Sequence, residues 1–295
     1  MQLAIKYLIV TFFTILFLQC DSFLQREIHP KYKDYDTLKV PYTLYAPKSK
    51  VKLHWDLEEV SGLSYYMGGQ LLAVEDETGN VYVLDAETGD VNQKVKFNKG
   101  GDYEGVEYDG VNVWVMESDG TFYSFQIENS EADNVREYKS AFSSKNDLEG
   151  LGYIRGNLLV AAKGEGTIAG VENSGKGVYT IKNNDPVPFL FIERDTLENY
   201  IKGRDHFYEI RDFDPSGIAI HPLNNDIYIL SADHILVVYT SDLKLKEVVK
   251  LDGVLMEQPE GICFSPEGVL YISSEGNDSR GELFIFHYLS TSSKE

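Results

Sequence analysis

Cysteine and basic residues are both scarce in this chain. The 295 residues include only two cysteines, Cys20 and Cys263, too few for the disulfide framework that stabilises small secreted domains. Only 27 Lys and Arg residues stand against 47 Asp and Glu, for a formal net charge of −20. A negative field of this size repels phosphate backbones, so nucleic acid is not an expected partner.

Long apolar runs are missing as well. The apolar run over residues 7–18, preceded by Lys6, is shorter than the roughly 20 residues that cross a bilayer. Its length and its basic flank are typical of a secretory signal peptide, which we place at residues 1–19. Cys20 follows directly and resembles the acylated cysteine of a bacterial lipobox, although Gln19 replaces the usual small residue.

We therefore expect a lipid anchor at Cys20, with the protein held in the cell envelope of a bacterium. An ordinary secreted or periplasmic protein is the alternative. The polar residues 20–39 are expected to form a tether, and residues 40–295 to form one domain. Cys263 lies in an apolar run, where a buried and inert thiol is expected.

The domain consists of repeats. Five segments each begin with a polar or acidic cluster and a glycine, continue as an alternating apolar strand, turn, and enter a second apolar strand. The glycines are separated by 43, 45, 67 and 44 residues. They are Gly62, Gly105, Gly150, Gly217 and Gly261. Three of these spacings match the roughly 40–50 residues of one four-stranded propeller blade, so we predict a five-bladed β-propeller.

The long spacing contains an insertion between the third and fourth repeats. Residues 195–203 combine a capping box at Asp195, helical apolar spacing and a terminating Gly203, which predict a short helix. A sixth, degenerate blade in this region is the alternative. Before the first repeat, residues 40–55 alternate apolar and polar residues, and we expect them to supply the outer strand of the last blade and so close the ring.

Several segments resemble a known family. The run from Glu58 to Asp90 looks like the opening blade of the SdiA-regulated family. Tyr103-Glu104-Gly105-Val106 and Pro259-Glu260-Gly261-Ile262 look like its later blades. The resemblance covers residues 40–290 and implies a propeller of exported, often membrane-anchored bacterial proteins without an established reaction, in which a calcium ion is sometimes held.

Acidic side chains are expected to gather at one end of the central channel. The start of an inner strand and the end of the antiparallel second strand lie at the same face of a blade. The residues before the glycines are Ser61, Glu104, Glu149, Ser216 and Glu260, and the second strands end near Glu75, Glu117, Lys163, Ser231 and Glu275. Lys163 is expected to pair with Glu149 or Glu117, or to orient an anionic ligand.

Carboxylates confined in one channel mouth cannot all remain ionised without protons or a cation. Calcium suits ligation by oxygen alone, and we predict it at Glu104, Glu149 and Glu260, with Glu75 and Glu117 as further ligands. Calcium-dependent lactonase propellers of the gluconolactonase type are similar in carrying a metal-binding Glu before a glycine, although their asparagine ligands are absent here. The alternative is that each Glu is a solvated residue at a strand end.

Two functions remain open at this point. The first is a lipid-tethered, monomeric binding module, stabilised by calcium, for an unknown protein or small molecule. The second is a calcium-dependent lactonase, esterase or phosphoesterase. The second function needs a general base near the metal, for which Glu75, Glu117 and Asp233 are the candidates.

Overall fold

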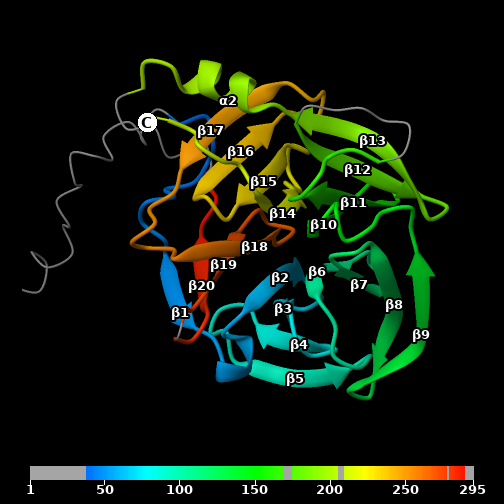
Figure 1. The fold of residues 1–295 in the computed structure, drawn as a ribbon. Helices are drawn as coiled ribbons and strands as arrows, with labels where there is room; N and C mark the ends of the chain where they lie inside the picture. Colours follow the sequence, from blue (N-terminus) through cyan, green and yellow to red (C-terminus); the bar gives the residue numbers. More distant parts are fainter. Residues whose placement is uncertain (1–37, 169–174, 205–208, 278, 290–295) are drawn as a thin grey trace, which may run out of the picture.

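The protein is a ring of five small β-sheets. A computed structural model describes residues 38–168, 175–204, 209–277 and 279–289. These residues form five four-stranded antiparallel sheets around a common axis (Figure 1). The predicted five-bladed β-propeller is therefore confirmed. The expected signal peptide, Cys20 and nearly all of the tether lie outside the described residues.

Each of the first three blades is a meander of four consecutive strands. Blade 1 comprises β2 (Val60–Tyr65), β3 (Gln70–Glu75), β4 (Asn80–Asp85) and β5 (Val91–Lys96). Blade 2 comprises β6 (Tyr103–Tyr108), β7 (Val113–Glu117), β8 (Thr121–Glu128) and β9 (Glu131–Lys139). Blade 3 comprises β10 (Leu148–Ile154), β11 (Asn157–Ala162), β12 (Lys176–Lys182) and β13 (Asp185–Ile192).

The last two blades differ in how they are completed. Blade 4 comprises β14 (Pro215–Ile220), β15 (Ile227–Ser231), β16 (Ile235–Tyr239) and β17 (Leu245–Lys250). Blade 5 comprises β18 (Gln258–Phe264), β19 (Leu270–Glu275), β20 (Glu282–Phe286) and the N-terminal β1 (Ser49–Lys52). A 3-10 turn, η2 (Trp55–Leu57), leads from β1 into blade 1.

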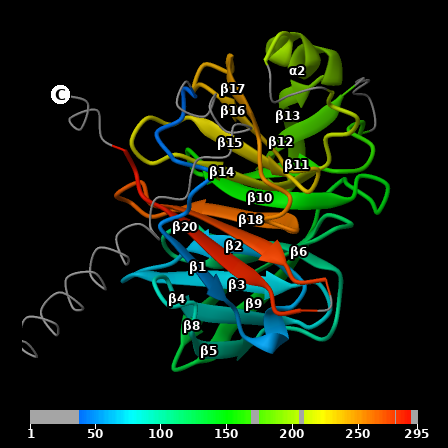
Figure 2. The same ribbon diagram turned by 90° about the vertical axis from the view of Figure 1, so that its left-hand side faces the viewer.

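Strand β1 closes the ring as predicted. It pairs antiparallel with β20, with Ser49 opposite Ile285, and lies along the outer edge of blade 5 (Figure 2). The strand is shorter than the predicted residues 40–55, because the chain before it packs as turns. Tyr42 is buried in the core between blades 4 and 5, where its hydroxyl donates to the Gly268 carbonyl at 2.7 Å. Burial of Tyr42 between blades 4 and 5 ties the segment before β1 to both blades.

The insertion between blades 3 and 4 contains the predicted helix, α2 (Arg194–Ile201). Its Leu197 and Ile201, four residues apart, are buried in the core between these blades. The capping prediction was wrong in detail: Glu193 is the N-cap and makes no side-chain cap bond, so Asp195 lies inside the first turn. The described residues contain five sheets, which leaves no place for the sixth blade.

The hydrophobic core is divided among the five spaces between neighbouring blades. Both faces of each sheet are covered, so consecutive side chains of one strand enter different spaces. Leu71 packs in the cluster shared by blades 5 and 1, and Leu72 in the cluster shared by blades 1 and 2. Cys263 is a buried free thiol in the former cluster, as predicted.

Candidate functional site at the channel mouth

The inner strands of all five blades contain an irregularity near their first residues. In β6, Tyr103 pairs with Glu117 and Gly105 pairs with Met116, so Glu104 has no partner in the ladder. A shift at the corresponding place skips one residue in β2, β10 and β14, and in β18 it lies between Pro259 and Ile262 and so includes Gly261 as well as Glu260. A bulge of this kind re-aims the extra side chain. The residues concerned are Ser61, Glu104, Glu149, Ser216 and Glu260.

The glycine after each of these residues lies against the inner strand of the next blade. A Cβ atom on Gly105 would stand 2.6 Å from the Cβ of Leu151 in β10. A Cβ atom on Gly261 in the last blade would stand 2.6 Å from the Cβ of Leu63 in the first. These contacts run from each blade to the next and from the last blade back to the first. The glycines therefore encircle the axis, and the residues that precede them share one channel.

The two serines of this ring connect neighbouring blades. Ser61 Oγ donates to the Tyr103 carbonyl at 2.6 Å, and Ser216 Oγ donates to the Pro259 carbonyl at 2.8 Å. Each accepting carbonyl belongs to the residue just before a channel glutamate. The serines therefore fix the backbone from which Glu104 and Glu260 project.

The carboxyl group of Glu104 has a strongly raised pKa. Burial raises its pKa to about 9, and the neighbouring charges of Glu149 and Asp102 add to the rise. Glu260 is far from Glu104 in the sequence, and burial raises its pKa as well. The negative charge of Glu149 adds to this rise. The mutual influence of these three glutamates agrees with their predicted convergence.

Glu149 is paired with a lysine on one side only. Lys163 Nζ lies 2.5 Å from Glu149 Oε1, which decides between the two predicted partners of this lysine. The other carboxylate oxygen, Oε2, is buried and has no hydrogen-bond partner, and the Glu149 side chain is only 8% exposed. Burial raises the Glu149 pKa to about 7 despite the lysine. The ring thus contains a desolvated oxygen in need of a donor or a cation.

The channel between the inner strands is narrow. A cavity of about 10 Å³ is bordered by residues of β2, β6, β10, β14 and β18, including Glu104 and Glu149. This is about the space that a single water molecule requires, and it excludes an organic substrate from the interior of the ring. A larger ligand of the channel can therefore bind only at its mouth.

Comparison with known proteins agrees with the architecture. The sequence profile of the SdiA-regulated family matches residues 50–279, which covers most of the chain and all five inner strands. The chain belongs to the SdiA-regulated family. A search among curated proteins finds no match to it.

Two solved structures are similar to this SdiA-regulated protein. Myxococcus xanthus glutaminyl cyclase superposes with a TM-score of 0.51 at 13% identity, covering 82% of this chain and 95% of the cyclase chain. Kuenenia stuttgartiensis hydrazine synthase gives a TM-score of 0.46 at 14% identity, covering 77% and 82% of the two chains. At such low identity the cyclase supports the fold alone.

The two further ligands predicted for the SdiA-regulated propeller stand apart from the three channel glutamates. Glu75 accepts hydrogen bonds from the backbone of Glu77 and from both the backbone and the hydroxyl of Thr78, so it caps a turn. Burial raises the pKa of Glu117, and the charges of Asp119 and Glu137 in the same blade add to the rise. Neither Glu75 nor Glu117 is among the main charges that raise the pKa of Glu104 or of Glu260.

Two acidic residues outside the predicted ligand set also lie at the mouth. Burial raises the pKa of Asp76 to about 6, helped by the charge of Glu59, and its Oδ1 is buried without a partner. Burial raises the pKa of Glu275 to about 7, helped by Asp76 and Glu59. Both residues stand at or just after the end of a second strand. Their acidic character at this position is the only feature of the sequence that indicates a place at the mouth.

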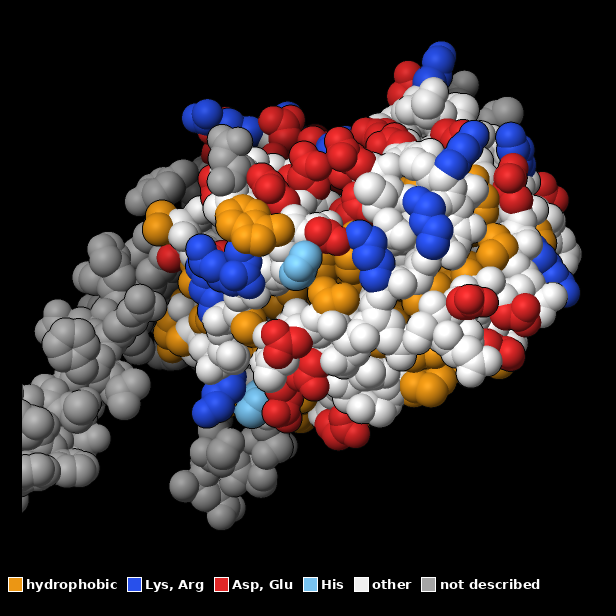
Figure 3. Space-filling model, turned by 90° about the horizontal axis from the view of Figure 1, so that it is seen from below, with side chains coloured by type: hydrophobic (Ala, Val, Ile, Leu, Met, Phe, Trp, Pro, Cys, Tyr) orange, Lys and Arg blue, Asp and Glu red, His pale blue; other side chains and the backbone are white. Residues whose placement is uncertain are grey.

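In the described part of the chain, no group of three or more His, Cys, Asp or Glu side chains is placed so that it could hold a metal ion. The helices of the same part are too short and too polar for a membrane span. Viewed from its edge, the disc has Asp and Glu side chains gathered along one rim (Figure 3). On this side of the molecule many acidic side chains gather along that rim, and smaller acidic groups lie elsewhere.

Proposed function

We propose that this SdiA-regulated protein is a lipid-tethered binding module of the bacterial cell envelope, whose channel mouth binds calcium. The observation that carries the proposal is the buried, unpartnered Oε2 of Glu149 beside two further desolvated glutamates. The predicted signal peptide and Cys20 support the envelope location.

The donor set suits a hard cation. Glu104, Glu149 and Glu260 offer carboxylate oxygens only, and each has a raised pKa that a bound cation would lower. Lys163 already supplies one positive charge to Glu149, which leaves most of the negative charge of the ring without an internal counter-charge. Bound calcium would add that charge and stabilise the inner strands against one another.

A binding module is better supported than a hydrolase. Hydrolysis needs a general base that is free to accept a proton near the ion. Glu75 is occupied by the turn that it caps, and Asp233 accepts from the Asp214 backbone at 2.8 Å and from the Ser231 hydroxyl at 3.1 Å. Both carboxylates are therefore engaged by neighbouring groups, which leaves Glu117 as the remaining candidate base, and the narrow channel confines any substrate to the mouth.

Thermal unfolding of the mature domain in calcium, in magnesium and in chelator tests the proposal. At a calcium concentration of about 100 times Kd we expect a stabilisation of roughly 2.7 kcal/mol, or about 5–10 °C in Tm, with little effect of magnesium. Glu104→Gln should abolish most of the shift, whereas the exposed Glu131→Gln should retain it.

Two results would contradict the proposal. One is the same Tm in calcium and in chelator for the unmodified domain. The other is a calcium shift that survives in both Glu104→Gln and Glu149→Gln. Turnover of a lactone or phosphoester by the calcium-loaded domain, lost in Glu104→Gln, would instead establish the hydrolase.

A further inference from the structure

A second hollow lies between blades 2 and 3, at the opposite end of the strands from the acidic mouth. Its volume is about 180 Å³. Asp109 reaches it from the turn between β6 and β7, and Asn183 from the turn between β12 and β13. Both turns are at the ends of the blades that face away from Glu104, because Glu104 stands at the start of β6.

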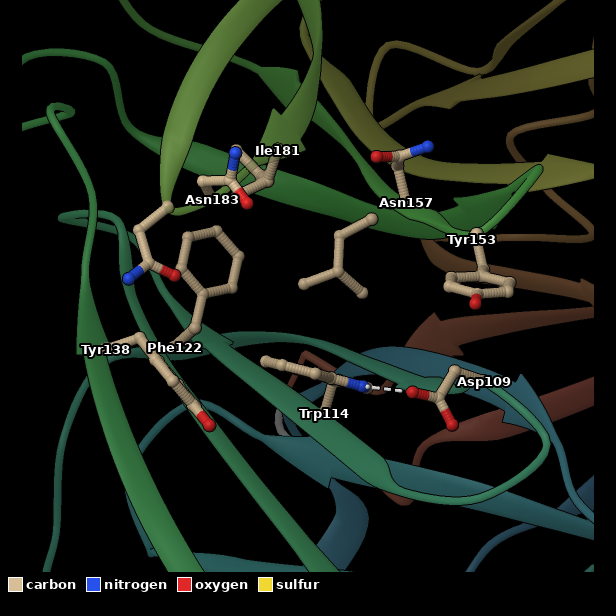
Figure 4. A pocket seen from close by; sticks show the side chains of 11 residues that line it. Asp109, Trp114, Phe122, Tyr138, Tyr153, Asn157, Ile181 and Asn183 are labelled. Atoms are coloured by element: carbon tan, nitrogen blue, oxygen red, sulfur yellow. Dashed lines mark hydrogen bonds between the residues drawn. The ribbon is translucent and has the colours of Figure 1, made fainter.

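Aromatic rings form much of the wall of this hollow. Trp114 and Tyr138 come from blade 2, and Tyr153 comes from blade 3. Figure 4 shows Asn157 and Asn183 across the hollow from Trp114 and Asp109. All three aromatic side chains pack against the core between these blades but are only partly buried, so part of each remains exposed to solvent.

The tryptophan is held in place by a carboxylate. Asp109 Oδ2 accepts from the Trp114 indole at 2.7 Å, the bond drawn in Figure 4. Its Oδ1 accepts from the backbone of Val111 at 2.8 Å and of Asn112 at 2.7 Å. Asp109 is thus a positioning residue, and these three hydrogen bonds already stabilise its negative charge.

Two tight hairpin turns bring amides to the rim. Arg155 and Gly156 join β10 to β11 with φ of 49° and 84°, and Asn183 and Asn184 join β12 to β13 with φ of 51° and 67°. Two positive φ values in succession suit Gly and Asn best. Asparagine at both positions of the second turn provides two exposed amides, each able to donate and to accept.

Charge and size limit the ligand. The described residues that line the hollow include no Lys or Arg, so an anionic group would find no counter-charge there. The volume is below the roughly 300–1,000 Å³ of pockets for drug-sized molecules. A single six-membered ring with several hydroxyl groups matches this size and polarity.

We propose that the hollow between blades 2 and 3 binds one neutral pyranose ring of a glycan. A pyranose has an apolar C–H face that packs on an aromatic ring, and hydroxyl groups around its edge that bond to amides. Trp114, Tyr138 and Tyr153 provide the aromatic faces, and Asn157, Asn183 and Asn184 provide the amides.

A neighbouring hollow extends the site. It has a volume of about 240 Å³ and shares Trp114 and Tyr138 with the first hollow. The polar side chains of Asn112, Gln126 and Asn134 border it, together with the cationic Arg136. The rings of Trp114 and Tyr138 lie 5.6 Å apart between their centroids. The chain of a linear glycan can therefore continue past this aromatic pair, and a short oligosaccharide is expected to bind more tightly than a monosaccharide.

The two tryptophans of the chain make the test direct. Trp55 is 61% exposed at a distant surface position, so Trp55→Phe leaves Trp114 as the only tryptophan. In this background, neutral methyl hexopyranosides and short oligosaccharides of glucose, mannose and N-acetylglucosamine are titrated while Trp114 emission is recorded. We expect a saturable change, with Kd of roughly 1 mM for the monosaccharide that fits and a lower value for its oligomers.

The matched variants replace asparagines by glycine, which retains the backbone conformation. Asn183→Gly combined with Asn184→Gly should weaken sugar binding at least tenfold. Asn225→Gly, at φ 59° in blade 4, should leave it unchanged. No change in emission with any sugar, equal affinity in the double variant, or preference for a peptide of similar size would overturn the proposal.

This site is independent of the channel. The titration is performed in chelator, and Glu104→Gln is expected to bind sugar as the unmodified domain does. Failure of the calcium proposal therefore leaves the sugar proposal standing, and the reverse also holds.

Discussion

Replacing Gly217 by alanine is expected to lower the free energy of unfolding by about 3 kcal/mol or more. A Cβ atom at this position would stand 2.5 Å from the carbonyl oxygen of Glu260 in the next inner strand. The obstacle is backbone, and it cannot rotate away as a flexible side chain does. Relief requires blades 4 and 5 to separate, which also breaks the 2.8 Å bond from Ser216 to Pro259. Urea denaturation followed by circular dichroism measures the loss.

Gly68 provides the matched control. It has a positive φ of 69° but no atom within 4 Å of the position of a Cβ, so Gly68→Ala costs only the backbone preference, about 1 kcal/mol. The difference between the two variants isolates the contact between blades. Equal losses in both would mean that the inner strands do not require glycine for their close approach.

The second large effect is on pH dependence. In calcium-free buffer, the free energy of unfolding is expected to fall by on the order of 3 kcal/mol between about pH 5 and about pH 9. Burial raises the pKa of Glu104 to about 9 and those of Glu149 and Glu275 to about 7, from 4.5. The folded state therefore holds more protons than the unfolded state in this range. Stability is greatest below the unfolded pKa and is lost as the pH rises through the folded values.

Chemical denaturation at a series of pH values, in chelator, measures this slope. Glu104→Gln removes a carboxyl group whose pKa is raised to about 9, so its curve should be flatter above about pH 7. Glu131→Gln, an exposed substitution of equal charge change, should follow the unmodified protein. A curve that is level or rises toward alkaline pH would show that the channel glutamates are solvated and ionised without cost.

The bulges explain why the site was predicted only in part. The order of residues shows that a glutamate precedes a glycine, but pairing across the blade determines that Glu104 is skipped in the ladder. Glu75 also follows the expected pattern, yet it is turned to the backbone of Thr78 by local hydrogen bonds. Position along a strand was therefore predictable, and the direction of the side chain was not.

Lys163 illustrates the same limit. Its place among acidic strand ends was evident, but two partners were equally acceptable from the sequence. The structure brings it to Glu149, the glutamate whose second oxygen lacks a partner. The hollow proposed to bind a pyranose was not predictable from the sequence, because Trp114 and Asn183 are 69 residues apart and belong to different blades.

The sequence alone determined the number of blades, the closure by an N-terminal strand and the identity of the five glycines and their preceding residues. These features follow from periodicity, because a repeat of about 44 residues with strands of alternating polarity forms one sheet after another. Only the tertiary structure decided which acidic residues share the mouth, which oxygen remains unpaired and where two blades leave room for a ligand. These three features depend on how neighbouring blades pack around the axis. That packing brings together residues that are far apart in the sequence, and no local sequence pattern indicates that they will meet.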